Sequence, residues 1–131
     1  MDLIDQVMPQ ILISLCAEAL GIMSTLNTLT VDYSKTRQQF GAPIGSFQVL
    51  QHRMVDMFMA CEQTKSMLYR GLCQAGEDDR GELLKTAHAL KTTVARYGKL
   101  IGEEAIQLHG GIGMTDELNI GHFVKRLMMI N

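Results

Sequence analysis

Long apolar periodic stretches restrict the fold of this chain more than any other feature. Within residues 9–38, apolar side chains recur at alternating steps of four and three, which place them on one helix face (Leu15, Ala19, Ile22, Leu26, Leu29 and Tyr33). A helix of that length extends about 45 Å at a rise of about 1.5 Å per residue. It therefore needs partners of similar length. Pro9 suits its first turn, where a missing N–H costs nothing.

The same period continues along the chain. It marks a second helix over residues 46–75 and a third over residues 81–109, and Thr115 or Asp116 can cap a shorter fourth helix. No strand pattern competes with these helices. We therefore predict an all-α domain over residues 1–131, folded as an up-down-up-down four-helix bundle. The fourth apolar pattern still runs at Asn131, so we expect the chain to be part of a longer protein.

Turn signals separate the first two helices. Gly41 and Gly45 permit backbone angles that other residues avoid, and Pro43 cannot continue a helix. Ser46 is a suitable N-cap for the second helix, and Gly76 can take the left-handed conformation after it. We expect the chain to turn sharply at both places.

The interior of the third predicted helix contains two glycines, Gly98 and Gly102. Each costs about 1 kcal/mol relative to alanine inside a helix. Their presence predicts that something approaches the helix backbone closely, an adjoining helix more readily than a ligand.

Composition and charge exclude several classes of function. The net charge is −2 and no long Lys/Arg run occurs, which argues against nucleic acid or an anionic membrane as the main partner. Residues 11–31 are apolar enough to suggest a membrane span, but Glu18 and Asn27 interrupt them, so we predict a buried bundle helix. Three cysteines without a C-x-x-C spacing (Cys16, Cys61 and Cys73) predict reduced thiols and a cytoplasmic location.

Few residues offer chemistry on their own. None of the four histidines has a Glu three residues before it or another His four residues away, so we assign no metal site. The glycines of residues 110–113 follow a predicted helix rather than a strand, which excludes a Rossmann fingerprint. Such a segment usually terminates a helix, although its N–H groups can also face an anion. Arg37 is suited to gripping a phosphate, or it caps the last carbonyls of its own helix.

Two motifs resemble those of a known family. Residues 33–41 (YSKTRQQFG) with Gln48, and residues 107–114 (QLHGGIGM), are similar to the two signatures of the acyl-CoA dehydrogenase C-terminal domain. They occur in the family's order, joined by its usual helical spacing, and together they cover nearly the whole chain. An unrelated bundle would have to carry both by chance.

The resemblance implies a function. Members of the family carry this helical bundle after a helical N-terminal domain and a middle β-domain, and they oxidise acyl-CoA thioesters at Cα–Cβ with FAD. The bundle forms the oligomer core, as a homo-oligomer or a heteromer, and its motifs reach the FAD of a neighbouring subunit. By position, Arg37 would pair with the FAD pyrophosphate, Phe40 and Gln48 would line the cofactor, and Gln107, Gly110 and Gly111 would lie against its ADP portion.

The catalytic base is the missing element, and the catalytic residues stay unknown. Most members of the family place a Glu at a distance past the glycine segment that here falls beyond Asn131. A few place it on the first helix, where this chain has Ile11. Glu18 does not match that position, and a place on a polar helix face or an inter-helix contact suits it better. We therefore expect this chain alone to be inactive, and two readings stay open: a domain of an active dehydrogenase, or a catalytically silent subunit domain that mediates oligomerisation.

Overall fold

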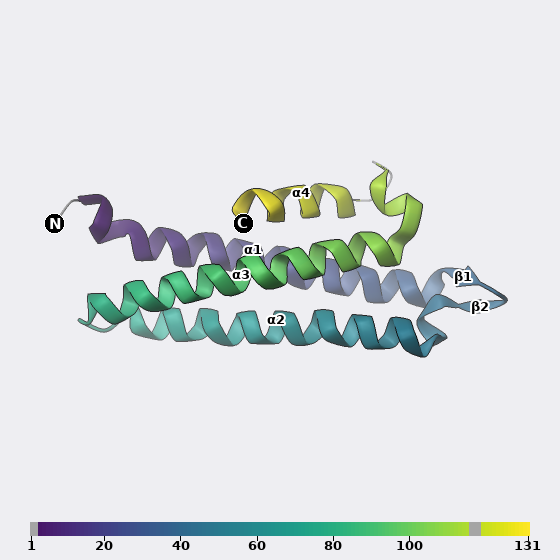
Figure 1. Cartoon of the computed structure of the whole chain (residues 1–131), viewed down its shortest axis with the longest axis horizontal. Helices are drawn as coiled ribbons and strands as arrows, with labels where there is room; N and C mark the ends of the chain where they lie inside the picture. The colour runs from purple at the N-terminus through teal and green to yellow at the C-terminus, as the bar shows by residue number, and fades with distance from the viewer. Residues whose placement is uncertain (1–2, 116–118) are drawn as a thin grey trace.

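The computed structural model describes residues 3–115 and 119–131, and it is almost entirely helical. The long helices α1, α2 and α3 alternate in direction, and the short α4 runs antiparallel to α3 along the same side as α1 (Figure 1). This arrangement confirms the predicted all-α, up-down-up-down bundle. The helices are α1 (Leu3–Thr36), α2 (Gln48–Gln74), α3 (Arg80–His109) and α4 (Ile120–Ile130).

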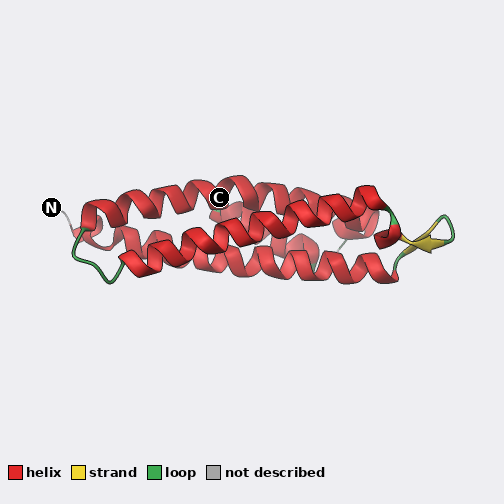
Figure 2. Cartoon of the chain, turned by 90° about the horizontal axis from the view of Figure 1, so that it is seen from below, coloured by secondary structure: helices red, strands yellow, loops and turns green. Residues whose placement is uncertain are grey.

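A hairpin and two short 3-10 turns connect these helices. Strands β1 (Gln38–Gln39) and β2 (Ala42–Pro43) pair antiparallel and project from one end of the bundle (Figure 2). The turn η1 (Ile44–Ser46) leads into α2, and η2 (Gly110–Met114) follows α3. The hairpin was not predicted, because strands of two residues leave no period in a sequence.

Helices α1 and α3 each pack against all of the other helices of the bundle, and the inner face of α1 forms a large part of the core. This face buries a continuous row of side chains at helical spacing: Ile13, Cys16, Ala19, Met23, Leu26 and Thr30. The outer face keeps apolar residues in solvent, including Ile4 and Ile11. By length and composition alone the span Val7–Thr36 is apolar enough to cross a membrane, and 28% of its most apolar window is buried inside the bundle.

The two interior glycines of α3, Gly98 and Gly102, lie against α4. A Cβ at Gly98 would lie 3.3 Å from Leu127 and from the Asn131 amide, and one at Gly102 would lie 3.4 Å from Val124. A Cβ at Gly98 would therefore require its α4 neighbours to shift by a few tenths of an ångström, and one at Gly102 would just touch Val124. The prediction that an adjoining helix approaches these glycines is confirmed.

Four details of the helix ends differ from the predictions. Helix α1 begins before Pro9, so this proline removes a hydrogen bond in the second turn instead of sitting harmlessly in the first. Ser46 is not the N-cap of α2, because its Oγ donates to the Pro43 carbonyl at 2.6 Å within η1, and Phe47 occupies the cap position. Gly76 does not take a positive φ. Helix α4 begins at Ile120 with Asn119 at its cap position, so Thr115 is not its N-cap, and Asp116 lies outside the described residues.

Helix α3 has a side-chain cap. The Asp79 carboxylate accepts a hydrogen bond from the Glu82 N–H at 3.0 Å, which satisfies one of the free N–H groups of the first turn. The acidic charge of Asp79 also favours the N-terminus of α3.

The cysteines divide into two kinds. Cys16 and Cys61 are buried and Cys73 is exposed, and all three are free thiols. Burial raises the pKa of Cys61 to about 11, so its thiol stays protonated at neutral pH.

Candidate functional site

The two motifs meet at the end of the bundle where α1 and α3 both finish. The hairpin fixes the position of Arg37 there, because the Arg37 carbonyl accepts a hydrogen bond from the Ile44 N–H at 2.8 Å. Gly45 then lies against α1 so closely that a Cβ would come within 2.8 Å of the Ser34 Oγ. The chain returning from the hairpin is thus held against the last turn of α1.

The Arg37 guanidinium is exposed and forms no hydrogen bond or ion pair with any residue in the described part of the chain. Its backbone N–H continues α1 by donating to the Tyr33 carbonyl at 2.9 Å. The capping interpretation requires the side chain to bond the last carbonyls of α1, and it does not. Because α1 and α3 both end here, their carbonyl ends add partial negative charge. An anion at this site therefore depends on a cation such as Arg37.

The structure explains the glycine at two of the three glycine positions of η2. Gly110 has φ +64, the left-handed region, and its N–H donates to the carbonyls of Ile106 and Gln107 to end α3. Gly113 packs on the preceding turn, since a Cβ there would lie 3.0 Å from the His109 Cβ. Gly111 has neither reason: its φ is ordinary and a Cβ would have nothing within 4 Å. The fold of this chain does not explain why residue 111 lacks a side chain.

A groove of about 440 Å³ lies between these segments. It brings together four of the six predicted cofactor-binding residues, Arg37 from the end of α1 and Gln107, Gly110 and Gly111 from the end of α3. The remaining lining residues are Tyr33, Gln39, Ile44, Leu108, His109 and Ile112. A groove that combines a cationic side chain with glycines, whose backbone is accessible, suits a phosphate-bearing ligand.

The other two predicted residues do not line this groove. Phe40 stands at the tip of the hairpin with 95% of its surface exposed and a φ of 54, which is uncommon for a residue with a Cβ. With Gly41 at φ 79, both central residues of the hairpin turn have positive φ, as a type I′ turn requires. Gln48 opens α2 and is exposed. Any contact of these two residues with a cofactor would involve a different part of it.

Sequence reasoning missed two residues that build this groove. The rings of Tyr33 and His109 are stacked with centroids 4.4 Å apart and an interplanar angle of 27°. His109 is buried, and its Nδ1 lies 2.8 Å from the Ala105 carbonyl. Burial lowers the pKa of His109, with the Ala105 hydrogen bond opposing that shift. Tyr33 and His109 both belong to the two motifs, so the sequence marked them as candidates. The contact between them could not be read from the sequence.

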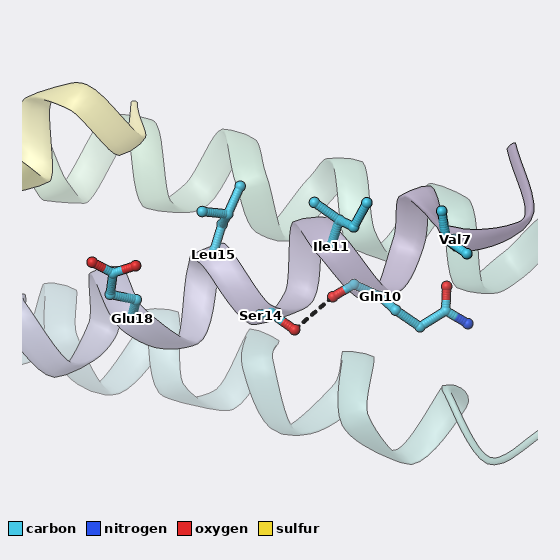
Figure 3. Close-up of a pocket in the computed structure, with 6 residues that line it drawn as sticks. All are labelled: Val7, Gln10, Ile11, Ser14, Leu15 and Glu18. Atoms are coloured by element: carbon cyan, nitrogen blue, oxygen red, sulfur yellow. Dashed lines mark hydrogen bonds between the residues drawn. The ribbon is translucent and has the colours of Figure 1, made fainter. Parts of the chain in front are cut away.

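Glu18 is the acidic residue that lines a groove along the outer face of α1, and its carboxylate is held by another side chain. This second groove, of about 420 Å³, is lined by α1 alone, from Val7 to Glu18, with Ile11 in its middle (Figure 3). Ile11 is 48% exposed and carries no proton acceptor in its side chain. The Glu18 carboxylate accepts two hydrogen bonds from Arg126 of α4, at 2.6 and 2.9 Å. The expected inter-helix role of Glu18 is confirmed.

A model of the acyl-CoA dehydrogenase C-terminal domain matches residues 6–130. Among curated relatives, acyl-CoA dehydrogenase IpdE2 of Mycolicibacterium smegmatis is 35% identical over 117 residues, which cover 86% of this chain and 34% of the relative. The chain thus spans about a third of the length of such relatives.

Solved structures agree with this match. Butyryl-CoA dehydrogenase from Megasphaera elsdenii superposes with a TM-score of 0.91 at 26% identity, over 96% of this chain and 32% of that one. PigA with FAD and proline gives 0.84 at 31% identity, over 94% and 32%. The ChsE4-ChsE5 complex from Mycobacterium tuberculosis gives 0.75 at 27% identity, over 91% and 31%. Relatives of this chain therefore include FAD complexes and an assembly of two named subunits. The chain belongs to the acyl-CoA dehydrogenase family, as its C-terminal helical domain.

Proposed function

We propose that this chain is the C-terminal part of a longer, cytoplasmic, FAD-dependent acyl-CoA dehydrogenase, and that its groove holds the diphosphate portion of FAD. The observation that carries the proposal is the meeting of Arg37 and Gly111 in one groove. The Arg37 guanidinium has no partner within the described residues. Gly111 has no side chain, although the fold leaves room for one.

The residues present fit a diphosphate. The Arg37 guanidinium offers a planar fork of donors that can bind two phosphate oxygens at once. The open space at Gly111 lets a ligand lie against the backbone, where a side chain would exclude it. Gln107 adds an exposed amide beside them. These three groups neutralise, seat and orient the ligand.

We infer that the FAD belongs mainly to a neighbouring subunit. The hairpin projects beyond the helices, and Phe40 at its tip has almost no contact with its own chain apart from an edge-to-face approach to Phe47 at 6.2 Å. An exposed aromatic side chain in a costly backbone conformation suits contact with another molecule. The assembly is a homo-oligomer or a heteromer.

In the complete enzyme, FAD supplies the acceptor for the hydride that leaves Cβ of an acyl-CoA thioester. The residues described here bind and orient the cofactor, and the proton acceptor for Cα lies elsewhere. A second candidate follows from the same absence: because Ile11 has no base and Glu18 is held by Arg126, this domain also suits a catalytically silent subunit whose partner carries the chemistry. Turnover of the full-length protein without any partner chain favours the first candidate, and turnover only with a partner favours the second.

Gly111→Ala tests the groove directly. We expect the variant, in the full-length protein, to keep its melting temperature and to bind FAD about tenfold more weakly, because a methyl group would occupy space the ligand needs. Gly76→Ala, in the turn at the opposite end of the bundle, is the matched control. If Gly111→Ala binds FAD as tightly as Gly76→Ala, no ligand lies against this backbone and the proposal is wrong.

A further inference from the structure

We propose that Tyr33 and His109 are a positioning pair that sets the Arg37 guanidinium at the correct separation from the Gly111 backbone. The inference rests on the proposed function and adds residues that neither bind charge nor carry out chemistry. It follows from a chain of contacts that joins the two motifs.

The first of these contacts lies within α1. The Tyr33 carbonyl accepts the hydrogen bond from the Arg37 N–H at 2.9 Å, so Tyr33 stands one helical turn before Arg37 and is bonded to it. The helix is rigid over one turn. Whatever fixes the Tyr33 side chain therefore fixes the place from which Arg37 extends.

The second of these contacts lies at the end of α3. The η2 turn folds back over His109, because the position of a Cβ on Gly113 falls 3.0 Å from the His109 Cβ and 3.2 Å from the Ile106 carbonyl oxygen. The imidazole is fixed in turn by its Nδ1, which donates to the Ala105 carbonyl at 2.8 Å. Since a carbonyl only accepts, Nδ1 carries the proton. The His109 side chain is thus held in one position beneath η2, the turn that contains Gly110 and Gly111.

The third of these contacts joins the two ends. The Tyr33 ring stacks on the imidazole at 4.4 Å, and its hydroxyl approaches the His109 carbonyl at 3.4 Å. The hydroxyl contact is long for an O–H···O hydrogen bond, so the stacked rings make most of the connection. Both residues line the groove, and the pair therefore links the side that carries Arg37 to the side formed by Gly110 and Gly111.

A double-mutant cycle on FAD affinity tests the pair, using Tyr33→Leu and Arg37→Ala in the full-length protein. A positioning residue acts through Arg37. We therefore expect Tyr33→Leu to weaken FAD binding about tenfold when Arg37 is present and less than twofold in the Arg37→Ala background. Tyr33→Phe, which keeps the stacked ring, is expected to recover binding to within about threefold of wild type.

Equal losses in the two backgrounds would show a general structural effect and overturn the inference, while leaving the proposed function intact. Wild-type affinity in Tyr33→Leu would also overturn it. If Arg37→Ala alone binds FAD normally, the proposed function fails first and the positioning pair fails with it. Should Tyr33→Leu not fold, His109→Gln replaces it in the same cycle, because it keeps a donor for the Ala105 carbonyl and removes the stack; the same pair of outcomes decides.

Discussion

Glu18 on α1 and Arg126 on α4 form a two-point ion pair, with Nε–Oε1 at 2.6 Å and Nη2–Oε2 at 2.9 Å. The hydrogen bond to Arg126 lowers the pKa of Glu18, so the carboxylate is a weaker base than an ordinary Glu. The pair therefore joins the short fourth helix to α1 and leaves the Glu18 carboxylate poorly suited to act as a catalytic base.

Glu18→Gln tests that conclusion. An amide keeps the shape and one acceptor, so we expect the full-length protein to retain acyl-CoA turnover within about threefold. Loss of a catalytic base costs about 10²- to 10⁴-fold. Dye reduction under anaerobic conditions measures the difference, with Glu103→Gln on the exposed face of α3 as the control. A hundredfold drop confined to Glu18→Gln would contradict the structural role.

Phe40→Asn separates stability from function. A left-handed conformation costs a residue with a Cβ about 1 kcal/mol or more, and Asn before Gly is the preferred pair in a type I′ hairpin. We expect the free energy of unfolding of the isolated chain to rise by about 0.5–1 kcal/mol. In the full-length protein the same change should weaken FAD binding, because the exposed ring is lost. A variant that is more stable and binds FAD normally would show that Phe40 has no cofactor role.

The stability of the chain should depend on pH through His109. Burial holds its pKa below the ordinary 6.5, so the unfolded chain takes up a proton at a higher pH than the folded chain does. The contribution of neutral His109 is therefore complete above about pH 6.5 and is lost as the pH falls from there through the folded-state pKa. Denaturant unfolding at pH 7.5 and 5.5 measures it.

His109→Phe, which keeps a flat ring, should remove that part of the pH dependence. His88→Gln, at an exposed position on α3, should leave it unchanged. If wild type and His109→Phe lose the same stability between the two pH values, His109 is not the group responsible.

Self-association should follow from the exposed apolar faces. Helix α1 leaves Ile4 and Ile11 in solvent, and α2 exposes Phe58, Tyr69 and Leu72. Apolar patches of this kind on a small domain usually contact another molecule. We expect a dimer or larger species in sedimentation at micromolar concentration, and a smaller species for Phe58→Lys with Ile11→Lys. A wild-type monomer would contradict this.

The helices and their order were predictable because the apolar period and the turn residues agreed along the chain. Details set by tertiary contact were not. Ser46 has the chemistry of an N-cap, yet η1 turns its hydroxyl to the Pro43 carbonyl. Gly76 can take a positive φ, and the turn between α2 and α3 does not require one.

The candidate site divides in the same way. Arg37 and Gly111 were identifiable from the motifs, and the structure places both beside one groove. Phe40 belongs to the same motif, yet the hairpin turns it away from that groove. The stack of Tyr33 on His109 joins residues 76 positions apart, and no local pattern records such a contact.

FAD dissociation constants of the full-length protein at fixed salt test most directly whether Arg37 binds the FAD diphosphate. Arg37→Ala removes a charge-assisted contact with two donors, so we predict about ten- to hundredfold weaker binding. Arg37→Lys should recover only part of the loss, because an ammonium keeps the charge without the planar fork. Gln38→Ala, the next residue and outside the groove, should bind as wild type does. If the FAD dissociation constant of Arg37→Ala lies within twofold of the wild-type value, Arg37 does not bind the diphosphate.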